Sequence, residues 1–261
     1  MYRDMTGGGI TRSLLLFALP MMAGSLLQQL YNVADTLIVG RALGRDALAA
    51  VGSAFTLTTF LTSVFLGLAM GAGALFAICI GRGDMAALRR AAALALCLIG
   101  AVTAVLTALV YALLSPILRF LQVPETLRGD MAGYLRIIFV GLAATFLYNF
   151  FACLLRAAGN SAAPLWFLGG AALLNVGLDL LFVLVCRWGV AGAAAATVTA
   201  QYAAGLGLTV YALRRCRELL PRRTDFRFDR RILRELLDLS LLTCVQQSAM
   251  NFGILLVQRL V

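Results

Sequence analysis

Apolar residues in this chain of 261 residues occur in long runs that are separated by short polar segments. Breaks at Gly, Pro and Arg divide the chain into six complete runs and the beginning of a seventh, at 14–39, 51–80, 91–114, 131–155, 165–185, 190–213 and from 236 onward. A hydrocarbon core of about 30 Å requires about 20 apolar residues in one helix. Because backbone N–H and C=O groups cannot stay unpaired in lipid, each run is predicted to be a membrane-spanning helix.

The composition favours the same class of protein. Hydrophobic residues make up 62% of the chain and charged residues 13%, whereas an ordinary soluble domain has roughly 25% charged residues. The six cysteines show no CxxC spacing, so they are interpreted as small apolar residues and not as a disulfide or zinc framework. The predicted fold is an all-α polytopic membrane protein.

The distribution of arginine predicts the orientation of the chain. All 22 basic residues are arginines, and the formal net charge is +10. A nucleic-acid binder can carry such a charge, but these arginines lie in short segments between apolar runs, so no nucleic-acid partner is expected. The amino terminus and the even-numbered loops hold 15 arginines, and the odd-numbered loops hold 6. Since cytoplasmic loops collect positive charge, the amino terminus is predicted to face the cytoplasm.

An arginine-rich segment at 214–234 divides the chain into unequal parts. Residues 1–213 are predicted to form a six-helix transmembrane lobe, 214–234 a basic cytoplasmic linker, and 235–261 the start of a second lobe with a truncated seventh helix. The Gln-Gln pair at 246–247 matches the pair at 28–29 when the chain is shifted by 218 positions. Such repeats are common in secondary transporters, so we expect a fragment of a protein with about twelve spans.

Two carboxyl groups, Asp35 and Asp179, lie inside apolar runs. A charged side chain at the centre of a bilayer costs about 2.5 to 3.5 kcal/mol, so it is retained where it has a function or a partner. Tyr31 and Asp35 are four residues apart, as are Asn175 and Asp179, so each pair shares one helix face. With a rise of about 1.5 Å per residue, Thr197 in the sixth run lies at a depth similar to that of Asp179. These five polar groups are expected to converge at one level.

The residue types in this cluster limit its chemistry. Carboxylate, amide and hydroxyl oxygens suit a small hard cation, so Asp35, Asn175, Asp179 and Thr197 are predicted to hold H⁺ or Na⁺, with Tyr31 beside them. The alternative is that the two aspartates only hydrogen-bond neighbouring helices, a contact worth about 0.6 to 2 kcal/mol. Ser, Thr or Asn would make that contact at a smaller cost in lipid, which favours the ion site. No other cofactor or metal is expected.

Four further polar residues lie at membrane depth: Gln28, Gln29, Tyr148 and Asn149. They are candidates for the lining of a substrate cavity. Amides and tyrosines in membranes more often form hydrogen bonds between helices, so both interpretations stay open.

Four strings resemble the amino-terminal lobe of the multidrug and toxic-compound extrusion (MATE) family: NVADTLIVGRALG at 32–44, RAAGNSAAP at 156–164, NVGLD at 175–179 and GVAGAAAATVTAQ at 189–201. The resemblance extends over essentially the whole chain. It implies a twelve-helix antiporter of the bacterial plasma (inner) membrane, with two six-helix lobes around a central cavity. Such a protein exports cationic or amphipathic small molecules in exchange for H⁺ or Na⁺, and the carboxy-terminal lobe would be a missing partner of this chain.

The resemblance also implies roles for particular residues. Family members with a cation site in the first lobe resemble this chain at Asp35, Asn175, Asp179 and Thr197. We expect that H⁺ or Na⁺ neutralises the two aspartates, lets the first helix shift or bend, and weakens the hold of the cavity on a cationic substrate.

Three other classes of protein are alternatives to an antiporter. A lipid-linked oligosaccharide flippase of the same superfamily would line its cavity with arginines, but the six runs hold almost none at mid-membrane. An intramembrane aspartyl protease would need a GxGD motif, whereas NVGL precedes Asp179, so no enzyme is predicted. A structural membrane scaffold would show no stabilisation by ions.

Overall fold

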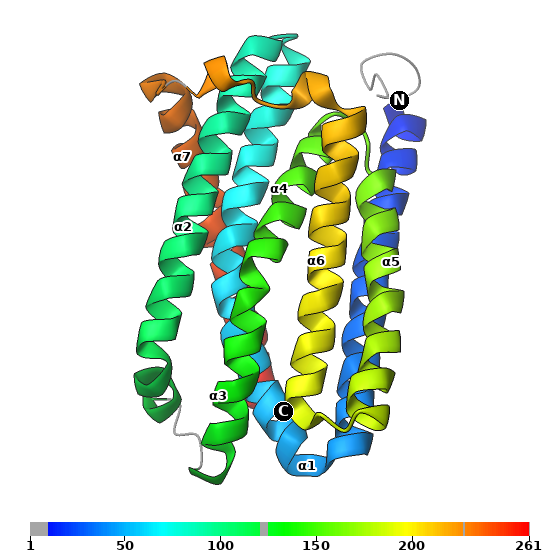
Figure 1. The fold of residues 1–261 in the computed structure, drawn as a ribbon. Helices are drawn as coiled ribbons and strands as arrows, with labels where there is room; N and C mark the ends of the chain where they lie inside the picture. The colour runs from blue at the N-terminus through cyan, green and yellow to red at the C-terminus, as the bar shows by residue number, and fades with distance from the viewer. Residues whose placement is uncertain (1–9, 121–124, 227, 261) are drawn as a thin grey trace.

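The computed structural model describes residues 10–120, 125–226 and 228–260, and all of its regular structure there is helical (Figure 1). The α-helices are α1 (Ile10–Gly81), α2 (Met85–Phe120), α3 (Glu125–Val140), α4 (Leu142–Ala157), α5 (Ala162–Asp179), α6 (Gly189–Arg215) and α7 (Arg230–Leu260). A π-helical turn, η1 (Leu180–Val185), follows α5, and two 3₁₀ turns, η2 (Arg217–Leu219) and η3 (Arg223–Asp225), precede α7. The predicted all-α fold is confirmed.

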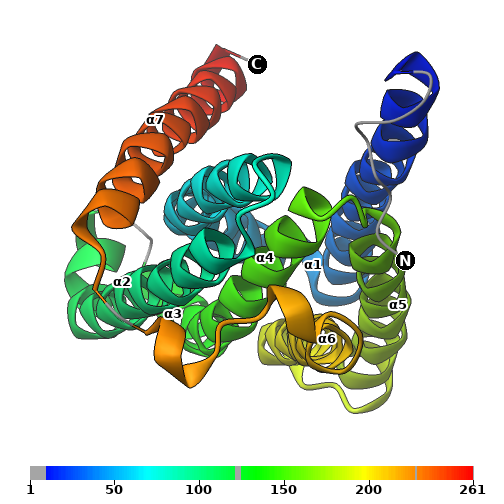
Figure 2. The same ribbon diagram turned by 90° about the horizontal axis from the view of Figure 1, so that it is seen from above.

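Four helical segments in the described part of the chain are long and apolar enough to cross a membrane: Leu61–Gly81, Met85–Pro116, Met131–Ala157 and Ala162–Val185. The other predicted spans, at 14–39, 190–213 and from 236, are also helical but are not among these four. The first of them carries Gln28, Gln29, Asn32 and Asp35, which lower its mean hydropathy. These helices pack against the apolar ones in a single bundle (Figure 2).

α1 contains two of the predicted spans. The helix is interrupted at Gly44, which has φ +87° and ψ −174°. Glycine adopts this conformation without the steric cost that a Cβ atom brings. The first two spans are therefore joined by a sharp bend with almost no loop.

The span predicted over 131–155 is found as one helical segment long enough to cross a membrane, Met131–Ala157, but its helix is interrupted at Gly141, between α3 and α4. The Gly141 N–H bonds to the carbonyl of Ile138, three residues back, which tightens the last turn of α3. A Cβ atom at Gly141 would collide with Oε1 of Gln201 on α6. Since the break frees carbonyl groups at the end of α3, one of them, Val140 O, accepts a hydrogen bond from the Tyr202 hydroxyl at 3.0 Å.

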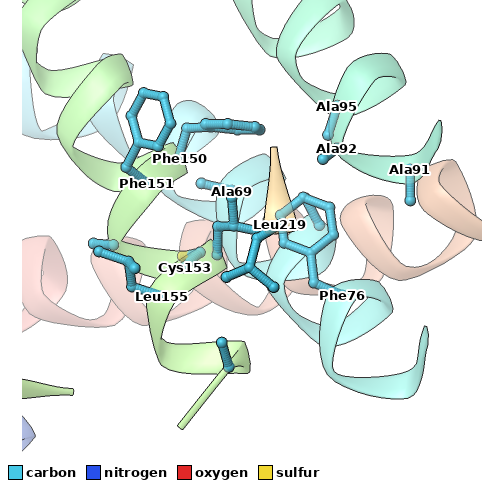
Figure 3. Packing of buried hydrophobic residues seen from close by; sticks show 14 of the residues in the cluster. Ala69, Phe76, Ala91, Ala92, Ala95, Phe150, Phe151, Cys153, Leu155 and Leu219 are labelled. Atoms are coloured by element: carbon cyan, nitrogen blue, oxygen red, sulfur yellow. The ribbon is translucent and has the colours of Figure 1, made fainter. Parts of the chain in front are cut away.

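The main core lies between the second half of α1, α2 and α4. Figure 3 shows Phe76 of α1 beside Phe150 of α4 and the alanines of α2. The Phe76 and Phe150 rings meet edge to face, with their centroids 6.0 Å apart. Ala91, Ala92 and Ala95 on α2 are buried, and their small side chains allow the helices to approach closely.

α7 packs against the second half of α1 through two glycines. A Cβ atom at Gly67 would lie 2.6 Å from Cα of Cys244, and one at Gly71 would collide with the backbone of Ser240. The Thr243 hydroxyl donates to the Gly67 carbonyl at 2.6 Å. Small residues and hydrogen bonds to backbone carbonyls thus join the two helices.

The arginine-rich connections lie at one end of the bundle. The turn between α1 and α2, the turn between α4 and α5 and the segment between α6 and α7 are together there, whereas the Gly44 bend is at the opposite end (Figure 1). The structure thus gathers the segments that the arginine distribution assigns to one side of the membrane.

Candidate functional site

The carboxyl groups of Asp35 on α1 and Asp179 on α5 lie within hydrogen-bonding reach of one another. Asp179 is fully buried, and Asp35 is partly exposed. Asp35 lies near the end of the first half of α1, and Asp179 is the last residue of α5 before the π-helical turn. The pair therefore sits inside the bundle, toward the end opposite the arginine-rich connections.

Asn175 and Thr197 lie beside Asp179. In the amide orientation that satisfies both of its ends, Asn175 donates from Nδ2 to Asp179 Oδ2 at 2.9 Å and accepts from the Thr197 backbone N–H at 3.2 Å. The Asn175 amide is also 3.4 Å from the Thr197 hydroxyl. Both residues are buried. This chain of contacts fixes the Asp179 carboxyl group against α6.

Two tyrosines complete the cluster. Tyr31 lies close to the Thr197 side chain and to both aspartates. Tyr134 on α3 is buried and lies near Asp35, Tyr31 and Asp179. Tyr134 is not among the residues predicted from the sequence, because a single tyrosine near the end of an apolar run is a weak signal. The structure thus brings together all five predicted residues and adds a sixth.

The oxygen atoms of the pair are not all satisfied. Within the described residues, Oδ1 of Asp35 and Oδ1 of Asp179 are buried and have no hydrogen-bond donor. Two carboxylates in contact cannot both stay ionised without a cation between them. The donor set of carboxylate, amide and hydroxyl oxygens fits a proton or Na⁺. In the same part of the chain, no group of three or more His, Cys, Asp or Glu residues could hold a metal ion.

The turn between α5 and α6 holds these two helices together near the site. A Cβ atom at Gly192 would be 3.1 Å from the carbonyl oxygen of Phe182, so only glycine fits there without displacing the turn. The rings of Phe182 and Trp188 stack with centroids 4.7 Å apart. Because Asn175 and Asp179 precede this turn and Thr197 follows it, close packing of the turn brings the three side chains to one level.

The four candidate cavity residues occupy separate environments. Gln28 and Gln29 are exposed on α1, and Gln29 accepts a hydrogen bond from Asn32 at 3.2 Å. Tyr148 donates to the Pro164 carbonyl at 3.1 Å, and Asn149 donates to the Thr145 carbonyl within α4 at 2.8 Å. Their role in substrate binding stays a prediction.

A pocket of about 490 Å³ lies elsewhere, between α2 and α4. Its lining includes Gly100, Thr103, Tyr111 and Phe146. None of the predicted site residues lines it, so the pocket and the aspartate cluster are separate features.

Comparisons with known proteins agree with this architecture. The chain is 33% identical over 198 residues to the probable multidrug resistance protein YpnP of Bacillus subtilis, an alignment that covers 76% of this chain and 44% of that protein. It is 28% identical over 213 residues to the probable multidrug resistance protein NorM of Thermotoga maritima, covering 78% and 44% of the two chains.

A solved outward-facing structure of a multidrug resistance MATE family transporter superposes on this chain with a TM-score of 0.87 and 26% identity, over 95% of this chain and 55% of that chain. The chain thus spans about half the length of the relatives that it matches.

The MatE family model matches residues 20–181, a region that contains Asp35, Asn175 and Asp179. This match extends over more than half of the chain. The chain therefore belongs to the MatE family, as the resemblance in its sequence predicts.

Proposed function

We propose that this chain supplies the ion-coupling half of a membrane antiporter that exports drugs or other cationic and amphipathic compounds in exchange for H⁺ or Na⁺. The observation that carries the proposal is the contact between the carboxyl groups of Asp35 and Asp179. Asp179 is fully buried, and an ionised carboxylate is costly in such a position. A bound cation or a proton would neutralise this charge.

The aspartate pair can couple ion binding to a change in helix position. Asp35 belongs to α1, whereas Asp179, Asn175 and Thr197 belong to α5 and α6, which are linked by their own hydrogen bonds. A bound cation draws Asp35 toward this fixed group, and its loss leaves two charges that repel one another. A bound ion then favours the position of α1 in which the site has the higher affinity for the ion. The size of the shift is set by the difference between the two affinities.

The names of the relatives support drug export over the flippase alternative, since two of them are probable multidrug resistance proteins. The substrates are expected to be small molecules that reach the protein from the membrane or the cytoplasm. We place the chain in the plasma membrane, with the arginine-rich end at the cytoplasmic face, because of the charge bias of its connections.

The test replaces Asp35 with Asn in the full-length protein and measures drug efflux in cells or vesicles. Separate Na⁺ and pH gradients are imposed. Asp35→Asn keeps the shape of the side chain but cannot hold a second charge next to Asp179. We expect the variant to reach the membrane in normal amounts and to lose efflux driven by either gradient.

Asp238→Asn is the matched control, because Asp238 is an exposed carboxyl group on α7. This variant should transport as the unmodified protein does. Efflux that survives Asp35→Asn at an unchanged rate would remove the coupling role of the pair.

A further inference from the structure

The transport proposal gives no role to residues 216–229, the part of the basic linker that lies between α6 and α7 and is here called the linker. We infer that this linker is an interfacial anchor that binds the headgroups of anionic phospholipids at the arginine-rich end of the bundle. The inference is independent of which substrate or ion the protein moves.

The linker is held against the bundle. Leu219 is 3% exposed and packs in the main core, together with the buried Cys216. Arg89 on α2 forms an ion pair with Asp225 at 3.6 Å, and Arg90 forms one with Asp229 at 3.6 Å. The described parts of the linker, 216–226 and 228–229, are therefore fixed to the bundle by packing and ion pairs.

The linker follows the outer edge of the bundle. Seen from above, the linker passes from α6 around the ends of α4 and α2 to the start of α7 (Figure 2). The helices that it borders are apolar and predicted to be surrounded by lipid. In a bilayer, the linker would thus lie at the level of the headgroups.

The charge on the linker and its flanks suits anionic headgroups. Residues 214–234 contain nine arginines and three acidic residues. Asp225 and Asp229 face the arginines of α2, and each also accepts a backbone N–H of the linker or α7, at 2.8 Å and 3.0 Å. These two aspartates are thereby turned toward the protein, whereas the third acidic residue, Glu218, is exposed. The exposed side chains of Arg214, Arg215, Arg217, Arg222 and Arg230 remain as positive charge on the outside.

Two aromatic residues next to this charge favour lipid over a soluble acidic partner. Phe226 is 51% exposed and Phe228 is 75% exposed. Exposed phenylalanines are unfavourable in water, whereas the membrane interface accepts aromatic side chains and attracts arginines to anionic headgroups. Leu241 and Leu242, farther along α7, are also exposed.

The test uses tryptophan fluorescence in nanodiscs that contain the full-length protein. Trp166 and Trp188 of this chain, and any tryptophans in the remainder of the full-length protein, are replaced by phenylalanine, and Phe226→Trp supplies one reporter. The discs contain phosphatidylcholine with an equal fraction of brominated phosphatidylglycerol or brominated phosphatidylcholine. We expect the brominated anionic lipid to quench the reporter about twofold more strongly, and added salt to reduce this difference.

Two sets of variants control the measurement. Leu173→Trp, at a 77% exposed position on α5, should be quenched equally by both lipids, because it contacts acyl chains only. Arg222→Gln together with Arg230→Gln should abolish the lipid selectivity at position 226, whereas Arg41→Gln at the opposite end should preserve it. If Phe226→Trp prevents folding, Phe228→Trp takes its place.

Equal quenching at position 226 by the two brominated lipids would overturn the inference, because it would show contact without headgroup selectivity. Absence of quenching by either lipid would also overturn it and would leave the linker free for a soluble partner. A selectivity that survives both salt and the arginine substitutions would have a source other than these charges, and this result would overturn the inference as well.

Discussion

At the scale of single residues, the contact between Asp35 and Asp179 is what favours the proposed ion site over ordinary polar contacts between helices. A serine or asparagine on α1 would have been sufficient for a hydrogen bond to α5. Here each aspartate retains a buried Oδ1 atom that no donor reaches within the described residues. Under the proposed function, a proton or cation bound between the two carboxyl groups would satisfy these atoms.

Thr197 offers a test of how the pair is supported. Its hydroxyl group contacts the Asn175 amide at 3.4 Å and lies close to Tyr31. Thr197→Val keeps the shape of the side chain and removes the hydroxyl group, so we expect a loss of about 1 to 3 kcal/mol in stability and weaker stabilisation by the coupling ion. Thermal unfolding of the purified protein with and without Na⁺, at several pH values, measures both effects.

The control for this substitution lies two residues away. Thr199 is exposed, and its hydroxyl bonds the Ala195 carbonyl of its own helix. Thr199→Val should change stability only slightly and leave the ion dependence intact. If the two variants behave alike, Thr197 has no special part in the site.

At the scale of helices, the seam between α1 and α7 depends on the absence of side chains at Gly67 and Gly71. Gly71→Ala would place a Cβ atom against the Ser240 backbone, which cannot move without displacing α7. We expect a destabilisation of about 1 to 3 kcal/mol, measured as a lower midpoint of thermal unfolding.

Gly170→Ala supplies the comparison, because nothing lies within 4 Å of a Cβ atom at that position in α5. Alanine is favoured over glycine in a helix by about 1 kcal/mol, so this variant should be equally stable or slightly more stable. Equal losses at Gly71 and Gly170 would show that the close approach of α7 does not matter.

The positions of the helices could be predicted from the apolar runs, but their irregularities could not. The apolar run over 131–155 continues through Gly141 without a change in hydropathy, and the close neighbour of Gly141 is Gln201 on α6, which is far away in the sequence. The π-helical turn after Asp179 has a similar origin, because its sequence, LLFVLV, fits a regular helix equally well. Such features arise from packing between segments and leave no local pattern.

The same reasoning explains which site residues could be predicted. Asp35, Asn175 and Asp179 are conspicuous because they interrupt apolar runs at helical spacing. Tyr134 is an amphipathic residue in a mixed segment, and only the arrangement of α3 beside α1 brings it to the aspartates. Charge in lipid is a strong local signal, whereas a tyrosine hydroxyl is a weak one.

At the scale of the whole molecule, the chain combines two parts with different chemistry. The aspartate cluster lies toward one end of the bundle, and the basic linker lies at the other (Figure 1). The division into a lobe at 1–213, a linker at 214–234 and the start of a second lobe at 235–261 stays a prediction. In the structure, α7 packs on the second half of α1, and the Gly44 bend separates this half from the one that carries Asp35.

The most direct test is the ion dependence of thermal unfolding of the full-length protein, compared between the unmodified form, Asp35→Asn and Asp238→Asn. Na⁺ is titrated against K⁺ at constant ionic strength, and the pH is varied separately. We expect the midpoint of the unmodified protein and of Asp238→Asn to rise with Na⁺ or as the pH falls, and the midpoint of Asp35→Asn to be insensitive to both. An unmodified protein that responds to neither ion, or an Asp35→Asn variant that retains the full response, would contradict an ion site at Asp35 and Asp179.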